Sequence, residues 1–152
     1  MNSKLQTYQE IVPQVASIIE GVGNRTGALA NVSSLLKGAF SHYFWVGFYI
    51  VNGDALELGP FQGDPACYSI GKGKGVCGTA WAEGQSVTVP DVHKFPGHIA
   101  CSSKSCSEIV VPIMKGDEVK AVIDVDSESY GSFDDTDREG LERIAVILSA
   151  LF

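Results

Sequence analysis

The chain has 152 residues, of which 45% are hydrophobic and 19% are charged, which is typical of a globular domain and excludes a disordered chain or a fibrous repeat. A domain of this length buries roughly 70% of the surface of its unfolded chain, so a core can form without metal or disulfide crosslinks. The net charge is −7 and the lysines and arginines are scattered along the sequence, so we expect no nucleic acid partner.

The N-terminal part of the sequence has the apolar periodicity of two helices. Residues 3–20 carry apolar side chains at helical spacing, although Pro13 should kink this segment or start a new turn. Gly21 and Gly23 then end the pattern. A second helix is predicted for residues 26–40. Its apolar face consists of Leu29, Val32, Leu35, Leu36 and Phe40.

The next segment has the composition and spacing of a β-hairpin. Residues 43–51 are rich in aromatic and β-branched side chains, Asn52-Gly53 is a strong hairpin turn, and residues 54–59 resume the strand pattern. Residues 60–75 are punctuated by Gly and Pro and are expected to form a loop. We therefore predict a first hairpin followed by an irregular connection.

The middle of the chain is less regular. A short helix is predicted to begin near Cys77, and a strand is predicted at residues 86–89. Residues 90–107 show little regular pattern. A loop of this length inside a compact domain is more often functional than a linker.

A second hairpin and a final helix complete the chain. Residues 108–115 and 118–127 are predicted strands, joined by a turn at Gly116-Asp117. The last helix is predicted to begin at Asp134 or Asp135, since acidic residues stabilise the first turn of a helix, and to end at residue 151. Its inward face should consist of Leu141, Ile144, Ile147, Leu148 and Leu151.

The order of these elements indicates the fold class. No internal repeat or boundary interrupts residues 1–152, so we predict one domain. Helices at both ends of the chain and hairpin connections between the strands are typical of an α+β fold, in which helices pack on one face of an antiparallel sheet.

Strand alternation predicts which side chains share a face of this sheet, because successive residues point to opposite sides. In residues 118–127, one set should face the helices: Val119, Ala121, Ile123 and Val125. The other set should face away from them: Lys120, Val122, Asp124 and Asp126. Glu108, on the preceding strand, is predicted on the same face as the two aspartates.

Trp45 and Tyr49 share one face of the first hairpin. If this face coincides with that of the three acids, the result is a box with aromatic walls and an acidic floor. Such a box suits a small cation, and a zwitterionic amino acid would fit it. Two alternatives remain open: Asp124 and Asp126 can be solvent-facing positions of a half-exposed sheet, and the two aromatic residues can be ordinary core.

Four cysteines lie outside the strongly periodic segments: Cys67, Cys77, Cys101 and Cys106. The N-terminus lacks the apolar segment of a secretory signal and no apolar run is long enough to span a bilayer, so we expect a cytoplasmic protein without a membrane partner. Cytosolic disulfides are rare unless they are catalytic or redox-sensing, so the cysteines raise the question of thiol chemistry. Cys77, at the start of a predicted helix, should have a lowered pKa. Cys101 is expected to be exposed in its loop.

A zinc site is the main alternative for the cysteines, with His93 and His98 as further ligands. Structural zinc sites usually pair ligands two to four residues apart, and Cys67, Cys77 and Cys101 contain no such pair. Cys101 with Cys106 and His98 leaves a weak residual case. We therefore predict no metal.

Six segments of the sequence stand out as motifs: WVGFY (45–49), GPFQGDPAC (59–67), GKGVCGTAW (73–81), DVHKFPGHIAC (91–101), SEIVVPI (107–113) and VIDVDS (122–127). With these motifs, the chain resembles the free methionine-(R)-sulfoxide reductases, which are single GAF domains. Three cysteines fall in three separate motifs, and the resemblance spans nearly the whole chain. The resemblance implies a GAF-like sheet of six antiparallel strands, with the terminal helices on one face and the ligand pocket on the other.

The resemblance also implies roles for individual residues. Cys101 would attack the sulfoxide sulfur, and Cys67 and Cys77 would supply the resolving thiol. The substrate pocket would be lined by Trp45, Tyr49, Glu108, Asp124 and Asp126. The departure from the family is Cys106, an extra thiol, which leaves open whether it shares in resolution.

The resemblance implies partners as well. The substrate would be free methionine sulfoxide, no cofactor would be needed, and thioredoxin or a similar dithiol would restore the thiols. A homodimer is an expectation on general grounds alone. The alternative function is a GAF-type module that senses a small molecule or an oxidant without turnover.

Overall fold

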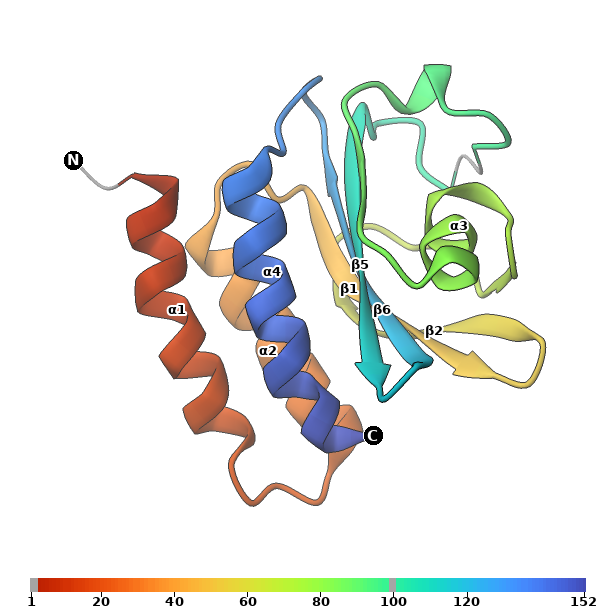
Figure 1. The fold of residues 1–152 in the computed structure, drawn as a ribbon. Coiled ribbons are helices and arrows are strands. Elements are labelled where there is room, and N and C mark those ends of the chain that lie inside the picture. Colours follow the sequence, from red (N-terminus) through yellow and green to blue (C-terminus); the bar gives the residue numbers. More distant parts are fainter. Residues whose placement is uncertain (1–2, 99–100) are drawn as a thin grey trace.

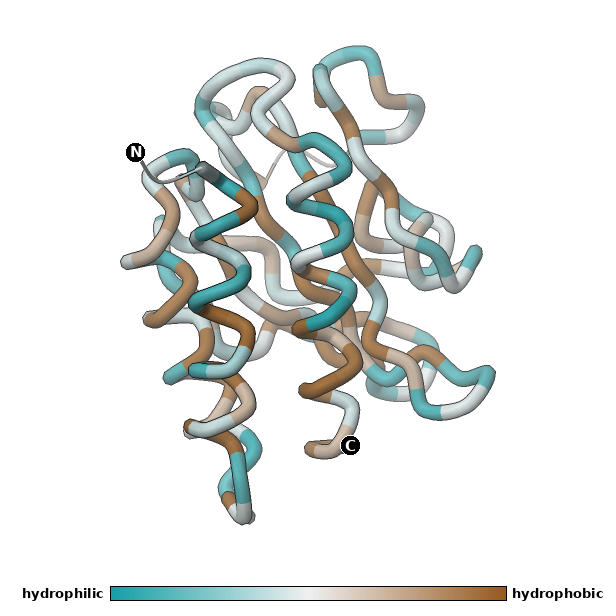
Figure 2. Tube along the Cα trace, turned by 60° about the vertical axis from the view of Figure 1, so that its left-hand side comes forward, coloured by the Kyte–Doolittle hydropathy of each residue, from teal (hydrophilic) through white to brown (hydrophobic). Residues whose placement is uncertain are grey.

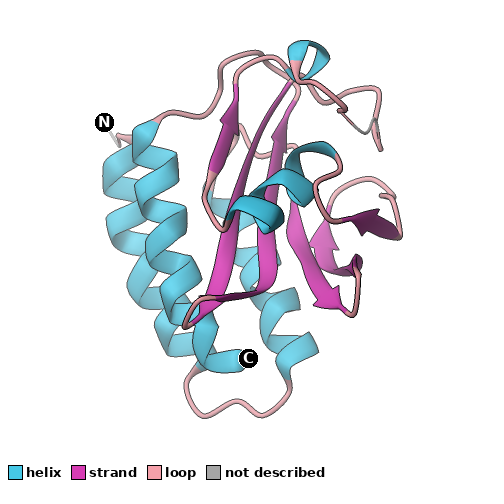
Figure 3. Cartoon of the chain, turned by 45° about the vertical axis from the view of Figure 1, so that its right-hand side comes forward, coloured by secondary structure: helices cyan, strands magenta, loops and turns pink. Residues whose placement is uncertain are grey.

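Three helices cover one face of a six-stranded antiparallel sheet, and a fourth helix lies on the opposite face (Figure 1, Figure 3). The structure is a computed structural model that describes residues 3–98 and 101–152, so two positions of the irregular 90–107 segment lie outside the described residues. The strand order is β3-β2-β1-β6-β5-β4, and every neighbouring pair is antiparallel. This is the predicted α+β fold, with the number of strands that the resemblance implied.

The elements have the following bounds. The helices are α1 (Lys4–Ile19), α2 (Arg25–Ala39), α3 (Gly75–Glu83) and α4 (Asp135–Leu148), with short 3₁₀ helices η1 (Val92–Lys94) and η2 (Ser149–Leu151). The strands are β1 (Trp45–Asn52), β2 (Ala55–Gln62), β3 (Ser69–Gly71), β4 (Val87–Val89), β5 (Ser107–Lys115) and β6 (Glu118–Ser127). Among the described residues, no helix is both long enough and apolar enough to cross a membrane.

The long helices begin where side chains can cap their free N–H groups. Ser3 accepts a hydrogen bond from the backbone of Gln6, and Asn24 accepts one from Gly27, both at 3.0 Å. Helix α1 continues through Pro13 without a break in its assignment. Hydrophobic and hydrophilic residues alternate along these helices (Figure 2), as expected for helices with one face in a core.

The sheet is buried on both faces, which decides the environment of the predicted site. Between the sheet and helices α1, α2 and α4 lies a first core layer that includes Leu29, Leu36, Phe48, Ile123 and Leu141. Between the sheet and α3 lies a second layer that includes Trp45, Tyr49, Cys77, Trp81 and Val122. A side chain on the α3 face of the central strands is therefore covered by protein and not by solvent.

Several short elements differ from the sequence prediction. Strand β2 extends to Gln62, β3 and η1 lie inside segments predicted as loops, and α4 ends at Leu148 before it tightens into η2. The placement of Val119 was wrong, because Val119 belongs to the layer beneath α3. Ile113 pairs with Ala121 and Met114 pairs with Val119, so the intervening Lys120 bulges out and reverses the alternation.

Candidate active site

A cavity lies on the α3 face of the sheet, where the strand faces predicted from alternation meet the cysteine loops. It is lined by Trp45, Tyr49, Pro65, Ala66, Ile70, Lys74, Gly75, Val76, Cys77, His98, Cys101, Ser102, Ser105, Glu108, Asp124 and Asp126. Of the eight predicted site residues, seven line this cavity and Cys67 does not. Cys67 is instead joined to the cavity by a disulfide with Cys101.

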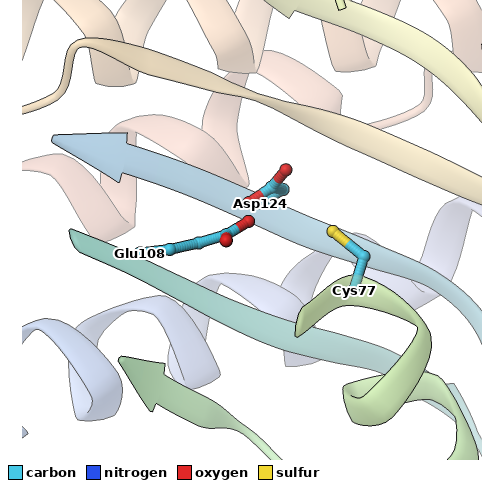
Figure 4. Close-up of side chains that lie close together, drawn as sticks. All are labelled: Cys77, Glu108 and Asp124. Atoms are coloured by element: carbon cyan, nitrogen blue, oxygen red, sulfur yellow. The ribbon is translucent and has the colours of Figure 1, made fainter. Parts of the chain in front are cut away.

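Three acids from two adjacent strands form the floor of the cavity. Glu108 on β5 lies opposite Asp126 on β6, and Asp126 in turn lies opposite Trp45 on β1. Asp124 is two residues from Asp126 and therefore on the same face. Glu108 and Asp124 are only 7% and 5% exposed, which excludes the solvent-facing alternative for Asp124. Figure 4 shows the carboxyl groups of Glu108 and Asp124 close together, with the sulfur of Cys77 pointing toward them.

Burial and mutual repulsion keep protons on this acid cluster. Burial, followed by the charges of Asp124 and Asp126, raises the pKa of Glu108 well above its ordinary range. Burial and the charge of Asp124 raise the pKa of Asp126 in the same direction. Burial also raises the pKa of Asp124, although hydrogen bonds with Glu108 and Cys77 oppose the rise. The cluster can therefore donate a proton at a pH at which isolated carboxyl groups are ionised.

One oxygen of the cluster is left without a partner. Among the described residues, no group donates a hydrogen bond to the buried Oδ1 atom of Asp124. A buried carboxylate oxygen in this condition costs free energy unless a ligand donates to it. The cavity floor is thus prepared for a small ligand that carries N–H donors.

The thiol of Cys77 differs from the prediction. Cys77 is the third residue of α3, as the motif suggested, but it is only 4% exposed and packs in the second core layer. Burial and the nearby charges of Asp124 and Glu108 raise its pKa well above the ordinary value, so the predicted lowering was wrong. The helix dipole does not overcome this desolvation, and Cys77 is a neutral thiol close to the carboxyl group of Asp124.

The donor groups at the floor are compact enough to share one cation. Ligand atoms of Cys77, Glu108 and Asp124 all lie within 4.8 Å of one another. A metal ion or an ammonium group could occupy such a set. The zinc set considered from the sequence is not available, because Cys101 is bonded to Cys67 and a disulfide sulfur is not a thiolate ligand.

The disulfide joins two loops that the sheet also holds. The Cα atoms of Cys67 and Cys101 are 5.4 Å apart. The indole Nε1 of Trp45 donates to the carbonyl of Asp64 at 2.9 Å, and the hydroxyl of Tyr49 donates to the carbonyl of Cys67 at 3.1 Å. The two aromatic residues therefore wall the cavity and also anchor the Cys67 loop, a second role that strand alternation could not reveal.

The aromatic wall is a stack on β1 and β2. The rings of Trp45 and Phe61 stack with their centroids 5.1 Å apart, and the ring of Tyr49 also stacks with that of Trp45, at 6.1 Å. A side chain at Gly47 would collide with Phe61 and Trp45, so the glycine between the two strand positions permits the stack. Burial and the charge of Asp124 raise the pKa of Tyr49, which keeps its hydroxyl a neutral donor.

Several lining residues were not identified from the sequence. His98 was considered only as a zinc ligand, yet it lines the cavity, where burial and the neighbouring His93 lower its pKa. Lys74, Gly75 and Val76 bring the first turn of α3 to the cavity, and the N-terminus of this helix has no side-chain cap. The sequence offered one signal for two of these residues: His98 lies in the motif that carries Cys101, and Lys74 lies in the motif that carries Cys77.

Comparisons with known proteins find relatives that match nearly the whole chain. The profile of the GAF domain matches residues 25–152. The chain is 49% identical to GAF domain-containing protein A of Dictyostelium discoideum over 96% of its length and 92% of that protein. It is 40% identical to free methionine-R-sulfoxide reductase of Escherichia coli over 96% of its length and 88% of that protein.

Solved structures show the same relationship. The structure superposes on free methionine-R-sulfoxide reductase from Neisseria meningitidis in complex with its substrate, with a TM-score of 0.96 and 46% identity. The match covers 100% of this chain and 92% of that one. The sequence identity and the near-complete coverage extend the similarity beyond the shared GAF architecture.

Proposed function

This chain belongs to the GAF-domain family of free methionine-R-sulfoxide reductases, and we propose that it reduces free L-methionine-(R)-sulfoxide to methionine. The observation that carries the proposal is that Cys101, which forms a disulfide with Cys67, lines the same cavity as a cluster of three acids with raised pKa values. An acid and a sulfur nucleophile in one small cavity are what sulfoxide reduction requires.

The cavity offers complementary groups to each end of a free amino acid. The ammonium group of the substrate binds the acid floor and donates a hydrogen bond to Oδ1 of Asp124, which has no other partner among the described residues. The substrate carboxylate binds the uncapped N–H groups at the start of α3, where the helix dipole favours an anion. The aromatic wall of Trp45 and Tyr49 accommodates the methyl sulfoxide end.

The reaction proceeds through a sulfenic acid. The Cys101 thiolate attacks the sulfoxide sulfur while the acid cluster protonates the sulfoxide oxygen, because an unprotonated oxide is a poor leaving group. The oxygen passes to Cys101 as a sulfenic acid and methionine is released. The Cys67 thiol then attacks this sulfenic acid, and a disulfide and water are formed. The Cys67–Cys101 bond supports Cys67 as the resolving thiol.

The same acid floor accounts for selection of the free amino acid. A methionine sulfoxide residue within a peptide has no ammonium group, because its nitrogen is part of an amide. Such a substrate would leave Asp124 and its neighbours buried without the cation that compensates them. We expect peptide-bound sulfoxide to be a poor substrate for this reason.

Reduction of the disulfide completes the cycle. Thioredoxin or a similar dithiol exchanges with the Cys67–Cys101 bond and restores both thiols. The proposal places the enzyme in the cytoplasm, because a reducing compartment keeps such dithiols available. A homodimer is included on the general ground that two-fold symmetric pairs are the commonest assemblies, and light scattering of the purified chain tests it.

The test is methionine release from free R-sulfoxide, free S-sulfoxide and a peptide-bound sulfoxide, with dithiothreitol as reductant. We expect turnover of the free R form alone. Cys101→Ser should abolish it, whereas Cys106→Ser, which alters a cysteine outside the cavity lining, should retain it. Absence of turnover with every substrate would support the sensing module instead. A metal analysis of the same preparation tests whether Cys77, Glu108 and Asp124 hold an ion.

A further inference from the structure

The two ends of the disulfide face different surroundings. Cys101 lines the cavity, whereas Cys67 is absent from the described residues that line it. Cys67 is followed directly by Tyr68, whose side chain is 85% exposed, and then by the exposed Ser69. Both cysteines are half-buried, but Cys67 adjoins this exposed rim and Cys101 adjoins the cavity.

The exposed rim is anchored and not loosely attached. The hydroxyl of Tyr49 donates to the carbonyl of Cys67 at 3.1 Å, and the N–H of Leu58 on β2 donates to the carbonyl of Tyr68 at 2.9 Å. Both bonds come from strands of the central sheet. An aromatic side chain held outward on a fixed backbone next to a reactive sulfur is suited to contact with another protein, because little ordering is needed on binding.

Thiol–disulfide exchange places the attacking, central and leaving sulfur atoms nearly in line. Because Cys101 lines the cavity and Cys67 does not, we expect a nucleophile that attacks Cys101 in line with the bond to come from the cavity side, where a protein has little room. Attack on Cys67 needs only access to the rim beside Tyr68. The geometry thus distinguishes the two sulfurs for a protein reductant, although a small thiol can approach either.

We propose that the reductant is a dithiol protein that docks on Tyr68 and attacks Sγ of Cys67. The inference rests on the proposed function, since it concerns the return of the enzyme to its reduced state. The partner's thiolate forms a mixed disulfide with Cys67, the Cys67–Cys101 bond breaks, and the electron pair leaves on Cys101. The second thiol of the partner then attacks the mixed disulfide and releases Cys67, so the partner is oxidised and both cysteines gain its two electrons.

This order has a consequence for catalysis. The first sulfur set free is Cys101, which leaves as the thiolate that the next substrate needs. Cys67 remains covalently occupied until the partner resolves the mixed disulfide. The nucleophile is regenerated before the resolving thiol, and the partner never has to enter the substrate cavity.

The first test identifies the sulfur that is attacked. A Cys106→Ser background removes the partly exposed fourth thiol, and diamide forms the disulfide without any need for sulfoxide turnover. The probe is a thioredoxin whose second active-site cysteine is replaced by serine, so that the mixed disulfide persists. Lysines at positions 72, 74 and 94 let trypsin place the two cysteines on separate peptides for mass spectrometry. We expect the probe on Cys67, and a probe on Cys101 would overturn the proposal.

The second test addresses the docking side chain. Tyr68→Ala should slow reduction of the diamide-formed disulfide by intact thioredoxin about tenfold, the size expected for an aromatic anchor, and leave the rate with dithiothreitol unchanged. Tyr130→Ala is the matched control, because Tyr130 is also exposed, at 60%, but is not adjacent to Cys67. An unchanged thioredoxin rate in Tyr68→Ala, or an equal loss with both reductants, would overturn the proposal. Failure of the proposed function would show instead as absent methionine release.

Discussion

At the scale of single residues, Glu108 combines a cost to folding with a use in chemistry. Its carboxyl is buried between two other acids, and its pKa is raised well above the ordinary 4.5. A raised pKa in the folded state means that this group favours folding below its ordinary pKa and ceases to do so as pH rises toward the folded value. In the proposed reaction, the same protonated group is a candidate donor of the proton that the sulfoxide oxygen needs.

Glu108→Gln should separate these two effects. Glutamine keeps the hydrogen-bond donor but not the ionisation, so the variant should gain stability relative to the wild type as pH rises from about 5 to 8. Its kcat/KM should fall by about 100-fold, since the amide cannot transfer a proton. Thermal unfolding at both pH values and methionine release provide the two readouts. Glu57→Gln, on an exposed position of β2, is the control and should change neither the pH dependence of stability nor kcat/KM. A wild-type rate in Glu108→Gln would rule out Glu108 as the proton donor.

The cysteines also have distinct roles that substitution can resolve. Because Cys101 is bonded to Cys67 while Cys77 is a buried neutral thiol, Cys67→Ser should release a single equivalent of methionine and then turn over only slowly with thioredoxin. Cys77→Ala should still form the disulfide and continue to turn over. Quenched-flow methionine release with excess substrate measures both. A single equivalent from Cys77→Ala and full turnover from Cys67→Ser would assign resolution to Cys77.

At the scale of elements, the start of α4 joins parts of the chain that are far apart in sequence. Asp134 and Asp137 form a reciprocal capping box, and Asp137 is fully buried. Lys4 Nζ and Tyr8 Oη both donate to Asp137 at 2.7 Å, and His42 Nε2 lies 3.0 Å from it. One carboxylate thus ties α1 and the α2–β1 connection to α4. Burial alone would raise the pKa of Asp137, but the hydrogen bonds outweigh it and lower the pKa to about 2.

Asp137→Asn should therefore reduce stability in a pH-dependent way. A folded pKa of about 2, against an ordinary 3.8, corresponds to about 2 kcal/mol at neutral pH. This contribution is present above pH 4 and is lost as pH falls toward 2, so the difference between variant and wild type should narrow there. Urea unfolding at pH 7 and pH 3 measures it. Asp135→Asn alters a 90% exposed side chain of the same turn and should be nearly neutral. An equal loss at both pH values would exclude ionisation as the cause.

The elements also show what a sequence can and cannot predict. The two hairpins were predicted because Asn52-Gly53 and Gly116-Asp117 are local turn signals, and alternation then placed Glu108 with the aspartates. Strand β3 was missed because three residues acquire strand structure only by pairing with β2. The burial of Cys77 was missed for a similar reason. A helix start is local information, whereas the packing of α3 on the acid floor is tertiary.

At the scale of the whole molecule, one sheet belongs to two core layers. Neighbouring positions of β6 divide between them, with Ile123 packed toward the long helices and Val122 toward α3. Loss of either layer would expose the apolar face that it covers, on strands that the other layer also needs. We therefore expect residues 1–152 to unfold as a single GAF-like domain, in one transition that circular dichroism and intrinsic fluorescence report with the same midpoint. Two separate midpoints would show that the α3 layer unfolds independently.

Redox state should shift that midpoint, because the disulfide closes a long loop of this domain. Cys67 and Cys101 are separated by 34 residues, and closure of a loop of that length stabilises the folded state by up to about 4 kcal/mol through the entropy of the unfolded chain. The oxidised protein should thus resist urea better than the reduced protein. Cys67→Ser should abolish the difference and Cys106→Ser should preserve it. By thermodynamic linkage, the free energy by which the disulfide stabilises the fold equals the free energy by which folding favours the disulfide. We therefore expect the folded domain to favour disulfide formation after each turnover. Equal midpoints for oxidised and reduced wild type would mean that the fold gives no such bias and that Cys67 resolves the sulfenic acid by proximity alone.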